Sequence, residues 1–261
     1  MPLAAEERAD LRLAKTLLER RSLGMRLSEV LGRPIERGLR LLPEGAQEAL
    51  HDLTRAALER ALGAALMTLR TEGFGAVARE RMHRYAGAAA GAAGGVFGLV
   101  GLAIELPITT VLIFRTIAEI ARAEGHDLSE FGTRLACLEV FAFGGSRPED
   151  DAAETAYYAV RATLAKALSD AARHLAGQGM ARQGAPVLVR FVDAIAARFG
   201  VVVEEKMALE SVPLIGAVSG AVVNTVFIEH FQRIARGHFI LLRLERRHGG
   251  DLIEKLYAAE S

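Results

Sequence analysis

Four charged side chains interrupt the apolar parts of this sequence and are the first candidates for chemistry. Glu105 splits an otherwise uncharged run, Glu139 lies in the mostly apolar segment 138–143, and Arg115 and Glu119 are four residues apart. A carboxylate in apolar surroundings is costly unless it is paired with a cation or protonated. One arrangement that meets this requirement has Arg115 neutralising Glu105 or Glu139 across the core. Such a set forms a buried ion-pair network that fixes packing, a polar site that recognises a lipid head group or, as a third alternative, a catalytic carboxylate.

A second group of polar candidates lies toward the C-terminus. Asn224 stands in an uncharged run near Gly220 and Ala221, where a lone amide usually hydrogen-bonds a neighbouring helix. Residues 233–248 contain five arginines and one glutamate, a net charge of +4, with apolar residues between them. Arginines beside an apolar segment suit an anionic membrane surface, but they can equally pair with acids elsewhere, such as 149–151. The candidates for binding a lipid or another ligand are Glu105, Arg115, Glu119, Glu139, Asn224, Arg233 and Arg236.

Motifs for metals and nucleophiles are weak. Glu80-Arg-Met-His83 and Glu245-Arg-Arg-His248 have the Glu-x-x-His spacing of di-iron bundle ligands, but arginines flank both motifs and the second abuts a pair of glycines. Cys137 precedes a largely apolar turn and is most simply a small buried hydrophobe. We therefore predict no catalytic residue, no metal site and no cofactor, and keep a metal-dependent enzyme that uses Glu80 or His83 as an alternative.

Helices must position these side chains. Residues 4–22 and about 46–71 carry apolar side chains at every third or fourth position, which is the helical period. No segment shows a sustained period of two with β-branched residues, and 201–203 (Val-Val-Val) is too short to build a sheet upon. The sequence therefore predicts an all-α, multi-helix bundle.

Two long uncharged stretches are expected at the centre of this bundle. In 85–114, 29 of the 30 residues carry no charge, and in 211–228 no residue is charged. Glycines four apart at 87, 91 and 95 place small residues on one helical face, which lets helices approach closely. The first stretch is long enough for a membrane span, but Ala and Gly contribute little to insertion. The stretches are therefore either a tightly packed central helix pair or a hairpin that touches or enters a membrane.

The segments at the ends of these stretches are similar to each other. Residues 111–122 can be aligned with 225–236, since both end in Ile-Ala-Arg and share an apolar pattern. This similarity hints at an internal duplication that would pair the two halves about a pseudo-axis.

Composition excludes some functions. Lys plus Arg and Asp plus Glu are each 32 and Trp is absent, so neither a net positive field nor an indole platform is available to bind nucleic acid. One cysteine cannot form an intrachain disulfide, and the first ten residues carry charges where a signal peptide would be apolar. We expect a reducing, cytoplasmic location.

Three segments carry a resemblance to a known family. They are Glu105-Leu-Pro-Ile-Thr-Thr, continuing to Gly125; Cys137-Leu-Glu-Val-Phe-Ala-Phe-Gly-Gly145; and Pro213-Leu-Ile-Gly-Ala-Val-Ser-Gly, continuing to Asn224 and then to Arg246. In order and spacing they resemble the EcsC family, which is named for a protein encoded beside a bacterial ABC transporter. The similarity covers about 75–250, so we expect one helical domain over 1–261, with N-terminal helices in 1–74 and an EcsC-like core in 75–250. The resemblance implies a helical protein linked to envelope or transporter physiology and brings no catalytic residues.

These observations predict a non-enzymatic, membrane-associated accessory protein that contacts lipid or an apolar ligand. We expect it at the cytoplasmic side of the inner membrane, either peripheral or partly inserted. An ABC transporter or another membrane protein as partner is implied by the resemblance alone. The alternative is a soluble helical scaffold that binds another protein through its N-terminal helices.

Overall fold

Helices make up nearly all of the chain that the structure describes. The computed structural model describes residues 3–19, 23, 46–67, 98–145, 156–178, 185–210 and 216–260. Its α-helices are α1 (Ala5–Leu18), α4 (Ala46–Met67), α6 (Gly98–Ala123), α7 (Phe131–Glu139), α8 (Ala156–Gln178), α9 (Pro186–Glu210), α10 (Gly216–His248) and α11 (Gly250–Ala259), with a 3-10 turn, η1, at Val140–Phe143. None of these ranges contains a strand, which confirms the all-α multi-helix bundle.

The helix ends follow local chemistry. At the end of α6, Gly125 takes a φ of 82°, a left-handed conformation that glycine adopts without strain. The Gly125 N–H donates to the carbonyl of Arg122 and the His126 N–H to that of Ala121, which satisfies two carbonyls that the helix leaves open. Gly249, with a φ of 89°, separates α10 from α11 in the same way.

Two described helices correspond to expected ones, whose last expected residues, 20–22 and 68–71, lie outside the described residues. The helix expected over about 46–71 is described over Ala46–Met67, and the one expected over 4–22 is α1. The valine triplet 201–203 lies inside α9, which continues to Glu210 because the apolar period continues through it. Packing between helices thus decides a segment that β propensity alone leaves open.

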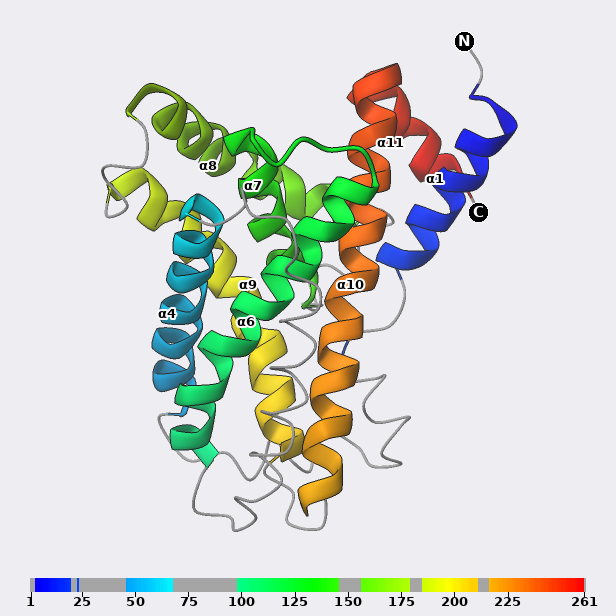
Figure 1. Ribbon diagram of the computed structural model, residues 1–261. Coiled ribbons are helices and arrows are strands. Elements are labelled where there is room, and N and C mark those ends of the chain that lie inside the picture. The colour runs from blue at the N-terminus through cyan, green and yellow to red at the C-terminus, as the bar shows by residue number, and fades with distance from the viewer. Residues whose placement is uncertain are drawn as a thin grey trace.

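The main core lies between α4, α6, α9 and α10, which pack against one another (Figure 1). At its centre the rings of Phe141, Phe199, Phe227 and Phe231 stack with centroid distances of 4.9–6.2 Å. Beside them, a Cβ added to Gly144 would lie 2.6 Å from the Phe231 ring, so the absence of a side chain there lets η1 approach α10.

A second, smaller core joins α1 and α11 to the C-terminal part of α10. It contains Leu3, Leu11, Ala14, Tyr157, Tyr158, Ile240, Leu241, Leu244, Ile253 and Tyr257. Helices α1 and α11 lie together at one end of the bundle (Figure 1).

The described parts of the two uncharged stretches lie at the opposite end. Residues 98–114 form the N-terminal part of α6 and 216–228 that of α10, and both helices begin at the lower end of Figure 1. Residues 85–97 and 211–215 lie outside the described residues. Among the helices that are described, none combines the length and the apolar character that crossing a membrane requires.

The two segments aligned as an internal duplication lie in α6 and α10, which pack against each other. A pseudo-axis between them stays a prediction.

Candidate functional site

An ion pair lies at the end of the bundle that holds the described parts of the uncharged stretches. Lys206 Nζ of α9 donates to Glu105 Oε1 of α6 at 2.9 Å. The Lys206 side chain is 1% exposed, whereas that of Glu105 is 25% exposed. Burial raises the pKa of Glu105, but the charge of Lys206 and hydrogen bonds from Lys206 and Asn224 outweigh burial and hold this pKa below its ordinary value. The carboxylate is therefore ionised, and the pair carries no net charge.

Glu105, Asn224 and Lys206 therefore form one polar cluster, made by α6, α10 and α9. Lys206 is almost fully buried and also lies 5.6 Å from the centroid of the Phe227 ring. A paired and hydrogen-bonded charge is the form in which an ionisable group tolerates such surroundings.

Lys206 is the functional candidate that sequence reasoning missed. It follows Phe199, Val202 and Val203 at helical spacing, so it falls on the buried face of α9. A lysine on an apolar stripe signals a buried partner, and that signal was available in the sequence. The expected partner of Glu105, Arg115, lies ten residues further along the same helix, about 15 Å away along its axis at 1.5 Å per residue. The cation paired with Glu105 is therefore Lys206, and not Arg115 as the sequence suggested.

Glu139 belongs to a different cluster, deep between α7, α8 and α10. Its side chain is 3% exposed, and burial raises its pKa to about 7, although the charge of Arg161 acts in the opposite direction. Its Oε2 lies 4.0 Å from Nε2 of His238, which is fully buried. Burial, followed by the charge of Arg161, holds the pKa of His238 well below its ordinary value, so the imidazole is neutral.

Tyr157 completes the contacts of this imidazole, since its hydroxyl lies 2.7 Å from His238 Nδ1. With the ring proton on Nε2, facing Glu139, Tyr157 donates to Nδ1. Because Glu139, Tyr157 and His238 are all buried, this cluster holds helices together and has no open face for a substrate.

Arg161 and Glu245 extend the same cluster toward the surface. Arg161 donates two hydrogen bonds to the carboxylate, at 2.6 and 3.0 Å, and the Tyr158 hydroxyl donates a third at 3.0 Å. Glu245 thus accepts hydrogen bonds from side chains of α8, whereas His248 contacts Glu7 of α1 at 2.9 Å. The second Glu-x-x-His motif is divided between two unrelated contacts and does not form one metal site.

The first such motif, Glu80 to His83, lies outside the described residues. Elsewhere in the described ranges no three His, Cys, Asp or Glu side chains come together in a way that could hold a metal ion. Cys137 is a free, fully buried thiol whose pKa is raised by burial, which confirms the prediction of a small buried hydrophobe.

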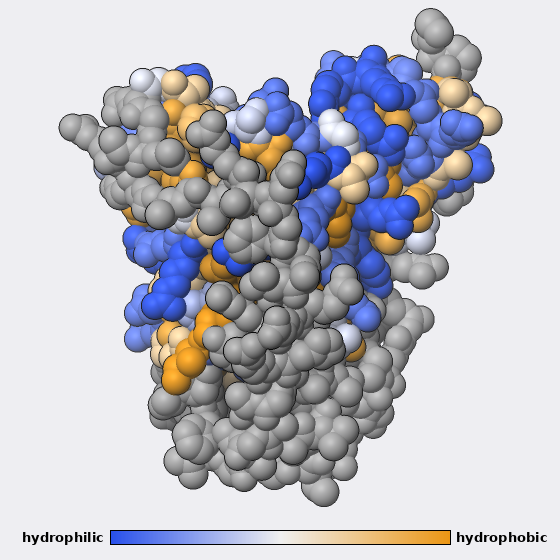
Figure 2. Space-filling model, in the orientation of Figure 1, coloured by the Kyte–Doolittle hydropathy of each residue, from blue (hydrophilic) through white to orange (hydrophobic). Residues whose placement is uncertain are grey.

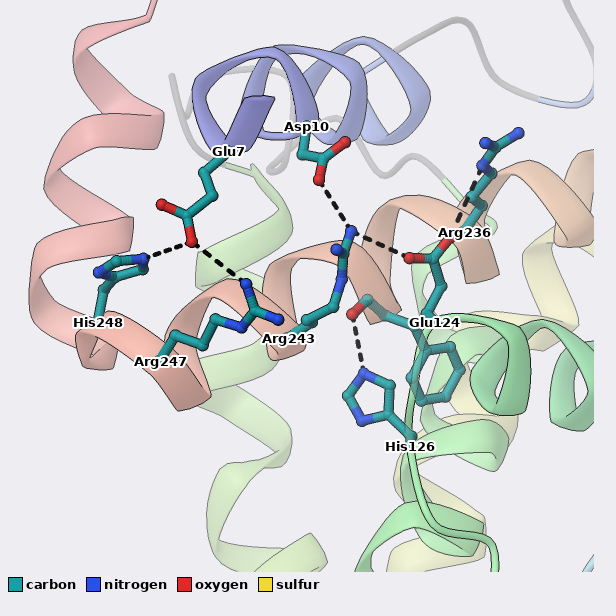
Figure 3. Close-up of polar contacts among 9 residues, drawn as sticks. Glu7, Asp10, Glu124, His126, Arg236, Arg243, Arg247 and His248 are labelled. Atoms are coloured by element: carbon teal, nitrogen blue, oxygen red, sulfur yellow. Dashed lines mark hydrogen bonds and ion pairs between the residues drawn. The ribbon is translucent and has the colours of Figure 1, made fainter. Parts of the chain in front are cut away.

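The basic side chains of α10 pair with acids of α1 and of the end of α6 (Figure 3). The pairs are Arg243 with Asp10 at 3.0 Å and with Glu124 at 3.1 Å, Arg236 with Glu124 at 3.9 Å, and Arg247 and His248 with Glu7 at 3.4 and 2.9 Å. Sequence reasoning anticipated pairing with acids elsewhere in the chain, and the observed acids are Glu7, Asp10 and Glu124. The suggested acids 149–151 lie outside the described residues.

The predicted binding residues are therefore distributed over several places. Glu105 and Asn224 come together, whereas Glu139 and Arg236 belong to separate clusters. Arg115 and Arg233 are half-buried on α6 and α10, and Glu119 is exposed on α6.

These features define a class: an all-α bundle in which Lys206 is buried against Glu105, and in which the described parts of two uncharged stretches lie at the same end. The model of the EcsC protein family matches residues 18–244, which is most of the chain. The chain belongs to the EcsC family. No curated protein and no solved structure matches it. All but the last residue of α1, and the whole of α11, lie outside the matched segment.

Proposed function

We propose that this protein is a non-enzymatic, membrane-associated accessory protein, and that it contacts lipid, or an apolar ligand, through the end of the bundle where α6 and α10 begin. We call this region the apolar end and define it by residues 98–114 and 216–228. The observation that carries the proposal is that the described parts of two uncharged stretches, distant in sequence, lie at one end of the molecule (Figure 1).

Exposure at the apolar end supports the proposal. Ile104 is 67% exposed, the largest value given for a large hydrophobic side chain in the described residues. Figure 2 shows hydrophobic side chains at the surface near the start of α6, while hydrophilic side chains predominate over α1 and α11 on the same face. An exposed apolar group at the end of an uncharged segment is typical of a membrane or ligand contact.

Neutralised charge is the second support. Within residues 98–114 and 216–228 the charged side chain is that of Glu105, and it is paired with Lys206 of α9. A paired charge enters a region of low dielectric constant at a much smaller cost than an isolated one. The paired arginines of α10, by contrast, lie toward the other end and make no contribution to this contact.

Flotation with lipid vesicles tests the proposal. The wild-type chain should float with neutral and with anionic vesicles, and flotation should persist at high salt because apolar contact is not screened. Ile104→Glu should reduce flotation on both vesicle types, since it places a carboxylate at the contact. The matched control is Leu13→Glu, because Leu13 is 36% exposed on α1, at the opposite end.

Equal flotation of the Ile104→Glu and Leu13→Glu variants would contradict the apolar end as the contact. Absence of flotation for every protein, under every condition, would contradict membrane association and leave the helical scaffold as the alternative. Links to envelope or transporter physiology, and a transporter as partner, follow from family membership and remain part of the proposal.

A further inference from the structure

Helix α1 lies across the basic part of α10 and meets it with its acidic side chains. Asp10 accepts a hydrogen bond from Arg243 at 3.0 Å, and Glu7 contacts both Arg247 and His248 (Figure 3). Although α1 contains as many basic as acidic residues, the two carboxylates closest to α10 both face its cations. The contact is therefore complementary in charge, and not only in shape.

The basic residues of α1 make a different contact. Lys15 donates to the carbonyl of Tyr257 at 3.0 Å, at the C-terminal end of α11, and Arg12 pairs with Glu260. Helix α1 is thus held by polar contacts on two sides, to α10 through its acids and to α11 through its bases.

The apolar contact of α1 is limited to a few side chains, since Leu3, Leu11 and Ala14 are buried and Leu18 packs beside them. Within the helix itself only Leu11 and Ala14 are buried, at 1% and 0% exposure. A helix of 14 residues is marginal in water by itself. Partly exposed ion pairs contribute modestly and are weakened by salt. The docked position of α1 is therefore held by a small apolar contact together with a set of charges that another anion could replace.

The face of α10 under α1 has the chemistry of a head-group surface. Arg236, Arg243, Arg247 and His248 provide donors for phosphate, and Ile240 and Leu244 lie between them on the same helix. Arginine binds phosphate and carboxylate oxygens with the same planar set of donors, so a lipid phosphate can take the place of Glu7 or Asp10.

We propose that this face of α10 is a second docking surface, for the anionic head groups of a membrane, and that α1 occupies it as an intramolecular substitute until it is displaced. The surface is distinct from the apolar end and differs from it in lipid selectivity and in salt dependence.

Gly237 makes a test possible without any change of charge. A Cβ at this position would lie 2.8 Å from Leu18 Cγ, 3.1 Å from the Ala14 carbonyl oxygen and 3.2 Å from Leu17 Cβ. Because one of these atoms belongs to the α1 backbone, α1 must shift. Gly237→Ala should therefore loosen α1, while alanine favours the helical conformation of α10.

The matched control is Gly200→Ala. It makes the same substitution inside α9, where an added Cβ meets nothing within 4 Å. A second loosening variant, Leu11→Asp, removes the buried apolar contact and adds a negative charge to α1 itself.

Two measurements are needed. Limited trypsin cleavage after Arg12 and Lys15, followed by mass, reports release of α1, and cleavage in Gly237→Ala should be about tenfold faster than in the wild type because the open form is more populated. Flotation with phosphatidylcholine vesicles, with and without phosphatidylglycerol, reports binding. Gly237→Ala should gain flotation only with the anionic vesicles and lose this gain at high salt, whereas Gly200→Ala should match the wild type.

Adding Arg243→Gln and Arg247→Gln to the Gly237→Ala variant should abolish the gain. Faster cleavage without a gain in anionic binding would overturn the proposal and point to an acidic protein segment as the occupant. If neither Gly237→Ala nor Leu11→Asp accelerates cleavage, α1 is a fixed part of the fold and the proposal fails. The gain is measured as flotation with anionic vesicles minus flotation with neutral vesicles. Binding through the apolar end is measured with neutral vesicles, so the two proposals can fail independently.

Discussion

At the scale of single residues, the buried Lys206 is paired with Glu105, and the two partners differ in exposure. Lys206 is almost fully buried while Glu105, its partner, keeps some contact with solvent. The cost of losing one partner should therefore depend on which partner is lost, because the residual charge remains in a different environment in each case.

Glu105→Gln should lower the free energy of unfolding by about 3 kcal/mol, since it removes the carboxylate charge that Lys206 contacts while Lys206 stays buried. Lys206→Met should cost less, because the remaining carboxylate is partly exposed and the methionine side chain suits the apolar surroundings. Urea unfolding of both variants measures the difference. A larger loss for Lys206→Met would show that the pair depends mainly on the lysine.

Glu139 makes stability depend on pH. Burial raises its pKa in the folded state to about 7, above the value of 4.5 for an unperturbed glutamate. Between these two values the folded chain binds more protons than the unfolded chain, so the free energy of unfolding falls as pH rises from about 4.5 to 7, and levels off above that. The loss should reach about 3 kcal/mol, at 1.36 kcal/mol per pKa unit.

Urea unfolding at several pH values, in the wild type and in Glu139→Gln, isolates this contribution. Glutamine does not titrate, so the wild type should lose stability relative to Glu139→Gln as pH rises from 5 to 8. A constant difference between the two proteins over that range would rule out Glu139 as the titrating group.

At the scale of elements, the sequence predicted helices and their starting points better than it predicted their contacts. The helical period of the apolar residues predicted α4 and α1, and the absence of a period of two argued against a sheet. Both predictions were possible because these patterns involve residues that are close together in the chain. Residues 201–203 were judged too short to build a sheet, and they lie inside α9, which continues to Glu210 and packs against α4 and α10.

Contacts between elements could not be predicted because they join residues far apart in the chain. Glu105 was recognised as a charge that needs a partner, yet Lys206 is 101 positions away and no local signal links the two. The arginines of α10 were predicted to bind either lipid or internal acids. Their pairing with Asp10, 233 positions away, depends on where α1 docks, which no periodicity specifies.

At the scale of the whole molecule, two cores of unequal size share helix α10. The main core includes parts of α4, α6, α7, α8, α9 and α10, whereas the smaller core joins α1 and α11 to one end of α10. A region with few buried side chains opens locally more often than a large core.

Amide hydrogen exchange, followed by mass spectrometry, should therefore detect α1 exchanging well before α4 and α9. The difference should increase at high salt, because screening weakens the ion pairs of α1 but not the apolar contacts of the main core. Equal protection of α1 and α9 would mean that both cores unfold as one unit.

Helix α10 has a mechanical consequence, because one rigid element of 33 residues extends from the apolar end to the residues that hold α1. At 1.5 Å per residue it is about 50 Å long. A tilt of about 5° around its midpoint would move each end by roughly 2 Å, which is enough to break a hydrogen bond of 3.0 Å such as the one between Arg243 and Asp10. A small displacement of α10 at the apolar end would then also change its contacts with α1 at the other end.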